Sequence, residues 1–304
     1  MGNSVRERRR LVLLAALIAL DIVLVSVALR SQPGASVAVA ESVPATAEPG
    51  PPTTAPTELS VPASPALLVD LSGTTAFRVS GPGTCAAGGA AVQVSTDGGG
   101  TWSDAEVPVR TVLRVLVTGT GAATMIGAGT DCRPASYQTT DGGRSWVRSG
   151  DTAGTWHRYG SAVARLHVPS RDAALPCPAG VALTDLAPGS VTRATVLCSD
   201  SSLHQTIDGG TRWTRRGELG GAVAINQSSV DRLVAAVTGV PGCSGVQVQT
   251  SDDGGTTWVA AGCAAGARSE AAVGLTFSDA ERGLLVTRDA TYRTSDGGAS
   301  WSAV

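Results

Sequence analysis

Apolar and polar residues alternate near the end of the chain in short runs that predict β-strands. In "VGLTF" the side chains of Val273, Leu275 and Phe277 lie at every second position, as expected for a strand with one buried face. The runs "GLLVT" and "TYRT" follow, and then come an Asp-Gly-Gly turn and "WSAV". This pattern predicts four short antiparallel strands joined by tight turns.

The Asp-Gly-Gly turn is not unique, because the same string occurs five times in the chain. The copies are "STDGGGTW", "TTDGGRSW", "TIDGGTRW", "SDDGGTTW" and "SDGGASW", and we call them the box turns. Their fixed residues are Asp97 and Trp102, Asp141 and Trp146, Asp208 and Trp213, Asp253 and Trp258, and Asp296 and Trp301. Successive box tryptophans are 44, 67, 45 and 43 residues apart, which gives a period near 44 with one surplus of 23 residues.

A four-stranded unit that repeats every 40 to 50 residues is typical of a β-propeller blade. The sequence therefore predicts an all-β propeller over residues 67–304. The length favours five blades, with the surplus around residues 155–174 forming an extra hairpin. The alternative is a six-bladed ring in which this segment is a shortened blade.

The box turns resemble the Asp-box, or bacterial neuraminidase repeat, whose pattern is Ser/Thr-x-Asp-x-Gly-x-Thr/Ser-Trp. Four of the five copies match throughout, and the third places Arg212 where a hydroxyl is expected. Propellers with this repeat include sialidases, sortilin-type receptors and photosystem II assembly factors. The resemblance implies a fold rather than one function, because functions differ among proteins that share a fold.

Each box turn has the residues of a hairpin lock. The Asp296 carboxylate can accept hydrogen bonds from turn N–H groups, and Gly297 and Gly298 supply backbone conformations that other residues resist. Trp301 can begin the outer strand and bury its ring beneath the turn. We therefore expect all ten box residues to be structural rather than catalytic.

Composition excludes several kinds of chemistry. All 23 basic residues are arginine, so the lysine of a P-loop or of a Schiff-base mechanism is missing. The net charge of -2 gives no sign of a nucleic-acid partner. With three histidines and no Cys-x-x-Cys, the sequence offers no zinc spacing, and no motif predicts another metal or a cofactor.

The six cysteines all lie beyond residue 84 and predict disulfides, which form in oxidising, extracytoplasmic compartments. Cys243 and Cys263 are equally far from Asp253, so a hairpin centred on that turn would place them opposite one another. Two strands and a turn separate Cys177 from Cys198, which should pair likewise. The remaining pair, Cys85 and Cys132, would join the first blade to the second.

The amino-terminal part predicts a membrane anchor. Residues 1–10 form a basic, cytoplasmic tail, and Leu11 to Leu29 is an apolar run long enough to span a bilayer. Residues 30–66 are rich in Pro, Ala and Thr and predict a disordered linker to an extracytoplasmic domain. A signal peptide cleaved after "AVA", near Glu41, is the alternative.

These features favour a membrane-anchored, non-catalytic binding or assembly module whose partner is a protein or a glycan. The alternative is an exo-glycosidase of the sialidase type, which needs three arginines, a Tyr-Glu nucleophile pair and an acidic residue. Arg78, in "AFRVSG", resembles the first of those arginines. Tyr159 is the one tyrosine outside the repeat, whereas Tyr137 and Tyr292 occupy a repeat position that indicates the blade surface. Among the glutamates, Glu106 and Glu218 should lie on outer strands and Glu281 in a turn. Glu270 is therefore the glutamate left as a partner for the tyrosine nucleophile.

Overall fold

The computed structural model describes residues 67–159, 165–268 and 273–304. Within these ranges, no helix has the length and apolar character needed to cross a bilayer. The tail, anchor and linker expected in residues 1–66 lie outside the described residues, as does Glu270.

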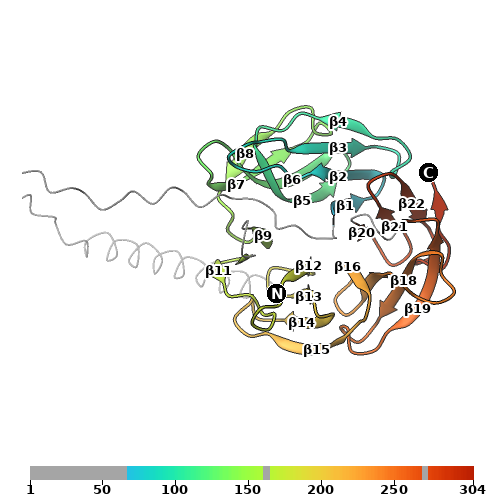
Figure 1. Cartoon of the computed structure of the whole chain (residues 1–304). Coiled ribbons are helices and arrows are strands. Elements are labelled where there is room, and N and C mark those ends of the chain that lie inside the picture. Colours follow the sequence, from blue (N-terminus) through green and yellow to red (C-terminus); the bar gives the residue numbers. More distant parts are fainter. Residues whose placement is uncertain (1–66, 160–164, 269–272) are drawn as a thin grey trace, which may run out of the picture. The chain divides into compact units, whose positions relative to one another are not determined.

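The described residues form six antiparallel sheets that follow one another around an axis, so the predicted all-β propeller is confirmed (Figure 1). We number these blades 1 to 6 in chain order. Blades 1 to 3 contain β1 (Leu68–Ser72), β2 (Thr75–Gly81), β3 (Ala91–Ser95) and β4 (Ser103–Ala105); β5 (Thr111–Gly119), β6 (Ala122–Ala128), β7 (Pro134–Thr139) and β8 (Val147–Gly150); and β9 (His157–Tyr159), β10 (Arg165–Val168) and β11 (Arg171–Ala173). Blades 4 to 6 contain β12 (Leu183–Pro188), β13 (Ala194–Cys198), β14 (Ser202–Thr206) and β15 (Thr214–Glu218); β16 (Ala222–Gln227), β17 (Leu233–Val237), β18 (Gly245–Ser251) and β19 (Val259–Ala265); and β20 (Gly274–Phe277), β21 (Gly283–Val286), β22 (Thr291–Thr294) and β23 (Ser302–Ala303).

The ring has six blades rather than the five favoured by the length of the chain. The surplus segment around residues 155–174 is not a hairpin added to another blade, because it forms the separate three-stranded sheet β9–β11. Strand β9 packs beside β5, the innermost strand of blade 2, and so takes a full position around the axis. Blade 3 is therefore the shortened blade of the six-bladed alternative, and the other five blades have the predicted four strands.

The ring closes between blade 6 and blade 1 without sharing a strand. The described chain starts on the innermost strand, β1, and ends on the outermost strand of blade 6, β23. Inner strands β1 and β20 pack together, and the Leu67 N–H donates a hydrogen bond to the Val273 carbonyl at 2.8 Å. The closure is thus held by this backbone bond and by an apolar cluster that includes Ala76 of β2 and Leu284 of β21.

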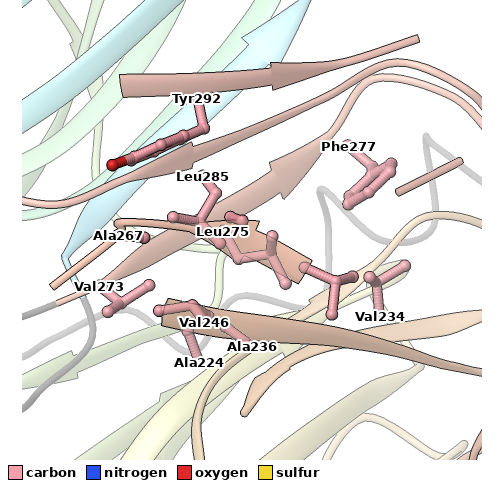
Figure 2. Close-up of a cluster of buried hydrophobic side chains, with 12 residues drawn as sticks. Ala224, Val234, Ala236, Val246, Ala267, Val273, Leu275, Phe277, Leu285 and Tyr292 are labelled. Atoms are coloured by element: carbon pink, nitrogen blue, oxygen red, sulfur yellow. The ribbon is translucent and has the colours of Figure 1, made fainter. Parts of the chain in front are cut away.

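The core is divided among the contacts between neighbouring blades, which we call seams. Five seams contain a cluster of buried apolar side chains, and each cluster includes one box tryptophan, contributed by the blade that comes next around the ring, which is blade 1 for the seam with blade 6. Figure 2 shows the cluster between blades 5 and 6, where Phe277 and Leu285 lie among the side chains of the preceding blade. Trp301 packs edge-on against Phe277 with ring centroids 6.1 Å apart. The box turn therefore fills a seam as well as closing a hairpin.

Hydrogen bonds inside each box turn follow one scheme. In blade 6, the buried Thr294 hydroxyl donates to Asp296 Oδ1 at 2.8 Å and accepts the Gly298 N–H at 2.9 Å. Asp296 also accepts the Ser300 N–H at 2.9 Å and the Ser300 hydroxyl, which together hold the pKa of this exposed carboxyl at about 2. The Gly297 N–H donates to the Glu281 carbonyl, so the turn is tied to the first turn of its own blade. In the third box turn, Arg212 supplies only its N–H to Asp208, because it has no hydroxyl.

Three disulfides join the six cysteines in the predicted pairs Cys85–Cys132, Cys177–Cys198 and Cys243–Cys263. The first connects the β2–β3 loop of blade 1 to the β6–β7 loop of blade 2. In the third, Cys263 lies opposite Gln247 rather than Cys243, because the β18–β19 hairpin is centred between Gly254 and Gly255 rather than on Asp253, and a bulge between Val248 and Gln249 adds one further residue to the offset. The predicted symmetry about Asp253 is therefore displaced, although the two sulfurs still meet.

Candidate functional site: the axial cavity

A cavity of about 170 Å³ lies on the propeller axis, where the inner strands of all six blades contribute to its wall. These strands are β1, β5, β9, β12, β16 and β20. None of the ten box residues lines the cavity. The cavity wall is therefore built from the inner strands and not from the box turns.

Each inner strand contributes one polar side chain that bonds to the next blade around the axis. These six residues, which we call the axial ring, are Asp70, Arg114, Arg158, Asp185, Asn226 and Thr276. All of them except Thr276 line the cavity. Each is paired on the second strand of its own blade with a large apolar residue, so the ring lies inside the packed wall of the propeller.

Every member of the axial ring makes a hydrogen bond to the next blade around the axis. The bonds join Asp70 Oδ2 with Val117 N (2.7 Å), Arg114 Nη1 with Trp156 O (2.9 Å), Arg158 Nη1 with Thr184 O, Asp185 Oδ2 with Ile225 N (2.8 Å), Asn226 Oδ1 with Phe277 N (3.2 Å), and Thr276 Oγ1 with Asp70 Oδ1 (3.2 Å). The sixth bond returns to blade 1. The axial ring therefore forms a closed circle of bonds in one direction around the cavity.

In this ring the negative charges of Asp70 and Asp185 are balanced by the positive charges of Arg114 and Arg158. Burial raises the pKa of Asp70 and Asp185, while backbone N–H donors and the neighbouring arginines oppose that rise. Burial likewise lowers the pKa of Arg114 to about 10, against the attraction of Asp70 and Asp185. Because each charge has both hydrogen bonds and an opposite charge, its burial is compensated.

Two further polar side chains of the inner strands reach the cavity. His157 of β9 is 2% exposed, and burial lowers its pKa to about 3, with His167 and Arg114 adding to the effect. Gln227 donates from Nε2 to the Val230 carbonyl at 2.8 Å, whereas its buried Oε1 has no hydrogen-bond partner in the described part of the protein. An uncompensated acceptor of this kind is where a ligand or water would bind.

The side chains considered for a sialidase do not gather at this cavity. Arg78 lies on β2, stacks 4.3 Å above the Trp102 ring, and donates to Gln93 Oε1 at 2.8 Å. Tyr159 is on β9 but outside the cavity wall, and Tyr292 is buried in the seam between blades 5 and 6 rather than on a blade surface. Tyr137 packs partly buried against the cluster between blades 1 and 2.

The predicted glutamate positions agree with the described structure. Glu218 ends the outer strand β15 and pairs with Arg215, while Glu106 directly follows the outer strand β4. Glu281 lies in the turn between β20 and β21. None of these three glutamates lines the axial cavity.

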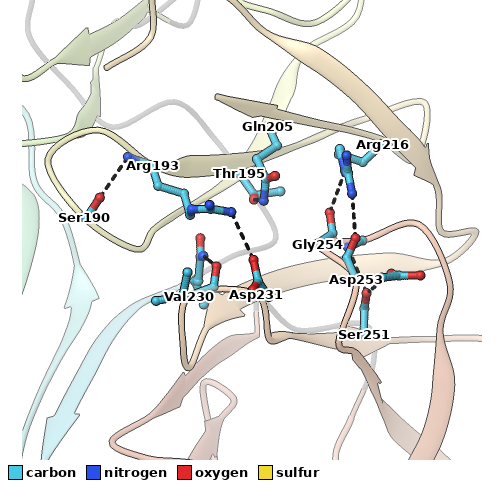
Figure 3. Close-up of polar contacts among 12 residues, drawn as sticks. Ser190, Arg193, Thr195, Gln205, Arg216, Val230, Asp231, Ser251, Asp253 and Gly254 are labelled. Atoms are coloured by element: carbon cyan, nitrogen blue, oxygen red, sulfur yellow. Dashed lines mark hydrogen bonds and ion pairs between the residues drawn. The ribbon is translucent and has the colours of Figure 1, made fainter. Parts of the chain in front are cut away.

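Arginines outside the cavity hold box turns to the preceding blade. Figure 3 shows the seam between blades 4 and 5, where Arg216 Nη2 donates to the Asp253 carbonyl at 2.6 Å. Arg193 forms an ion pair with Asp231 at 3.4 Å in the same seam. Arg293 donates to the Asp97 carbonyl at 3.1 Å in the seam between blades 6 and 1. These arginines link neighbouring blades, and Arg216 and Arg293 do so through the backbone carbonyl of a box aspartate that is itself exposed.

The wall of the axial cavity combines apolar side chains with the paired charges of the axial ring. Its two carboxylates already accept hydrogen bonds and face arginines, and neither a glutamate nor a tyrosine is found among the described residues of its wall. No group of three or more metal-binding side chains occurs in the ranges that the structure describes. The buried Gln227 Oε1 is the acceptor in this wall that has no hydrogen-bond partner among the described residues.

Sequence analysis did not identify the axial ring. Its signal is a single polar residue inside an apolar run, as in "LVDLS", "VLRVL" and "LTDLA". Such a residue usually indicates a strand face in contact with solvent, and the repeat period gives no reason to place it at the propeller axis instead. Only the closed arrangement of blades shows that these side chains lie together.

Comparison with known proteins gives similarity in structure alone. No family model matches the chain. No curated protein matches it either. Among solved structures, it is similar to YCF48 from Cyanidioschyzon merolae (15% identity, 82% of this chain, 86% of that chain, TM-score 0.42) and to YCF48 bound to D1 peptide (18%, 77%, 65%, 0.34). It is also similar to the GH74 enzyme of Niastella koreensis (12%, 78%, 40%, 0.35). The chain spans less than two thirds of the latter two structures.

Proposed function

We propose that this protein is a non-catalytic binding or assembly module that presents its propeller to a protein or glycan partner, with the axial cavity as the point of attachment. The observation that carries the proposal is the axial ring. Its charged side chains hold adjacent blades together and balance one another. A carboxylate used in this way is poorly placed to donate or accept a proton in a reaction.

The sequence supports an anchored arrangement for this module. The basic tail and the apolar run Leu11 to Leu29 would keep the amino terminus in the cytoplasm and place the propeller outside the membrane. The three disulfides agree with an oxidising compartment. A partner would then be an extracytoplasmic protein or glycan, brought close to the membrane by the linker.

Blocking the cavity tests the binding role. Leu116 lines the wall on β5, and Leu116→Trp would fill part of the 170 Å³. The matched control is Val147→Trp on the outer strand β8, where the side chain is 69% exposed. We expect affinity capture from membranes to lose its specific partner with Leu116→Trp and to keep it with Val147→Trp. Equal capture by both variants would exclude the cavity as the attachment point.

An assay with a fluorogenic sialoside tests the alternative of a sialidase. We expect no turnover by the full chain beyond that of a heat-denatured sample. Turnover that Arg78→Ala abolishes, in a variant that still melts cooperatively, would replace the binding proposal with the enzymatic one. Melting must be checked, because Arg78 also packs on Trp102.

A further inference from the structure

The seam between blades 2 and 3 differs from the other five. Each of those contains an apolar cluster with a box tryptophan. Between blades 2 and 3 the described residues form no such cluster, although Ile126, opposite Arg114 on β6, is buried on this side of blade 2. The cause is visible in the sequence, because blade 3 is the blade without a box turn. This seam therefore lacks the tryptophan that each other blade packs against its predecessor.

Polar side chains occupy the face of blade 3 that is turned toward blade 2. Leu166 and Val168 of β10 belong to the cluster with blade 4, so strand alternation turns His167 to the opposite face. His167 is paired with His157 on β9, and their rings stack with centroids 4.5 Å apart. His167 Nδ1 also contacts Asp172 Oδ1 at 2.9 Å, and its Nε2 contacts the Thr152 hydroxyl at 3.2 Å.

No disulfide ties this seam. Cys85–Cys132 joins blades 1 and 2, and Cys177–Cys198 joins the segment leaving blade 3 to blade 4. All six cysteines are used in the three bonds, so none is left to cross between blades 2 and 3. Across the seam, the axial ring contributes the bond from Arg114 to the Trp156 carbonyl, directly beside His157.

Protonation of His157 conflicts with its surroundings. Its side chain is buried, with Arg114 of blade 2 and His167 of β10 disfavouring a positive charge. Asp172 of β11 is the carboxylate that favours the charge, and it already accepts hydrogen bonds from Tyr159 and His167. Moving blade 3 away from blade 2 would bring His157 into water and relieve the conflict. The same movement would open the wall of the axial cavity, which His157 lines.

We propose that the seam between blades 2 and 3 is an acid-sensitive gate, which stays closed while His157 is neutral and opens when that residue takes up a proton. The opening is local, because the other seams are held by apolar clusters that do not titrate. The gate does not depend on what the axial cavity binds. It is a property of the ring itself.

The expected size of the effect follows from proton linkage. The pKa of His157 is lowered from 6.5 to about 3 in the closed seam. Because the open state binds the proton more tightly, the closed state is favoured above about pH 6.5 and loses that preference as the pH falls toward 3. Between pH 7.5 and pH 5, the opening constant should rise roughly 30-fold.

Hydrogen exchange followed by mass spectrometry on the full chain tests this gate. After correction for intrinsic exchange rates, peptides from residues 155–159 and 165–173 should lose protection roughly 30-fold between pH 7.5 and pH 5. Peptides from blades 5 and 6 should change far less. An equal loss of protection in all blades, or no loss in blade 3, would overturn the proposal.

Variants assign the effect to one residue. His157→Gln should remove the difference between the two pH values, while His204→Gln in blade 4 should leave it intact. If His157→Gln does not fold, His157→Phe keeps a ring against His167 without a titratable group and serves the same purpose. A pH response that persists in the folded His157 variant would show that another group operates the seam, and the proposal would be wrong.

Discussion

Removing the Asp185 carboxylate should destabilise the propeller more than any change of an exposed acidic residue. Asp185 lies on β12 in the wall of the axial cavity and is partly buried, and its two oxygens accept the Leu186 N–H and the Ile225 N–H, each at 2.8 Å. The Ile225 bond crosses from blade 4 to blade 5. Asp185 also faces Arg158, whose positive charge it balances.

The magnitude follows from what Asp185→Ala leaves behind. A buried N–H without an acceptor costs about 1–3 kcal/mol, and breaking a buried ion pair costs about 3–5 kcal/mol in all because the remaining charge is uncompensated. Arg158 keeps its bond to the Thr184 carbonyl, so we expect about 3–5 kcal/mol rather than the sum. Since whole domains have about 5–15 kcal/mol of stability, this is a large fraction.

Asp185→Asn separates the hydrogen bond from the charge. Its amide oxygen can still accept the Ile225 N–H, as Asn226 does with the Phe277 N–H at the next seam. We expect a smaller loss, about 1–3 kcal/mol. Asp231→Ala is the matched control, because Asp231 is 69% exposed and pairs only at the surface with Arg193.

Urea unfolding at pH 7.5, monitored by tryptophan fluorescence, gives the three free energies. The denaturant slope should be unchanged, so that the midpoints report stability. If Asp185→Ala cost less than about 1 kcal/mol, the bonds of the axial ring would not hold the blades together, and the assignment of the ring as the structural centre of the propeller would fail.

Four other outcomes are expected. Thr294→Val should lower the free energy of unfolding by about 1–3 kcal/mol, because the buried Gly298 N–H loses its acceptor. Ser295→Ala, at the exposed neighbouring position, should change the free energy of unfolding little, and equal effects of the two variants would contradict the box-turn scheme. The double variant Cys85→Ser and Cys132→Ser should be less stable to unfolding than the wild type by about 2–4 kcal/mol under oxidising conditions and equally stable under reducing conditions. Free thiols in the exported wild-type protein would refute the pairing. In a His157→Gln background, the free energy of unfolding should decrease as the pH is lowered from about 4 to 2. The box carboxyls Asp141 and Asp296 have pKa values lowered from 3.8 to about 2, so their contribution to stability is present above pH 4 and is lost as the pH falls through 2. Acid titration followed by circular dichroism measures this decrease, and a flat profile would count against it. The mature protein should keep its amino terminus and fractionate with membranes, whereas amino-terminal sequencing that starts near Glu41 would show a cleaved signal peptide.

The repeat could be read from the sequence because the box turn is a local structure. In blade 6 its hydroxyl, carboxylate, second glycine and Ser300 bond to one another within the seven residues from Thr294 to Ser300, so the same short string must recur wherever the same turn forms. The disulfide pairs were also accessible, since they join the ends of predicted hairpins and the corresponding loops of neighbouring blades. The box turn and the pairs Cys177–Cys198 and Cys243–Cys263 follow from contacts close in sequence, whereas Cys85–Cys132 spans 47 residues and was left as the remaining pair.

The number of blades and the axial site depended on contacts that are distant in sequence. Blade 3 has no box turn, so nothing local distinguishes β9–β11 from an inserted hairpin, and only packing of β9 beside β5 makes it a blade. The axial ring depends on closure in the same way. Thr276 and Asp70 are separated by most of the described chain, yet they meet at 3.2 Å because blade 6 returns to blade 1. The role of a polar side chain in an apolar strand cannot be assigned until the closed ring shows which blade that side chain faces. The same closed geometry determines the axial cavity and the one seam without a tryptophan.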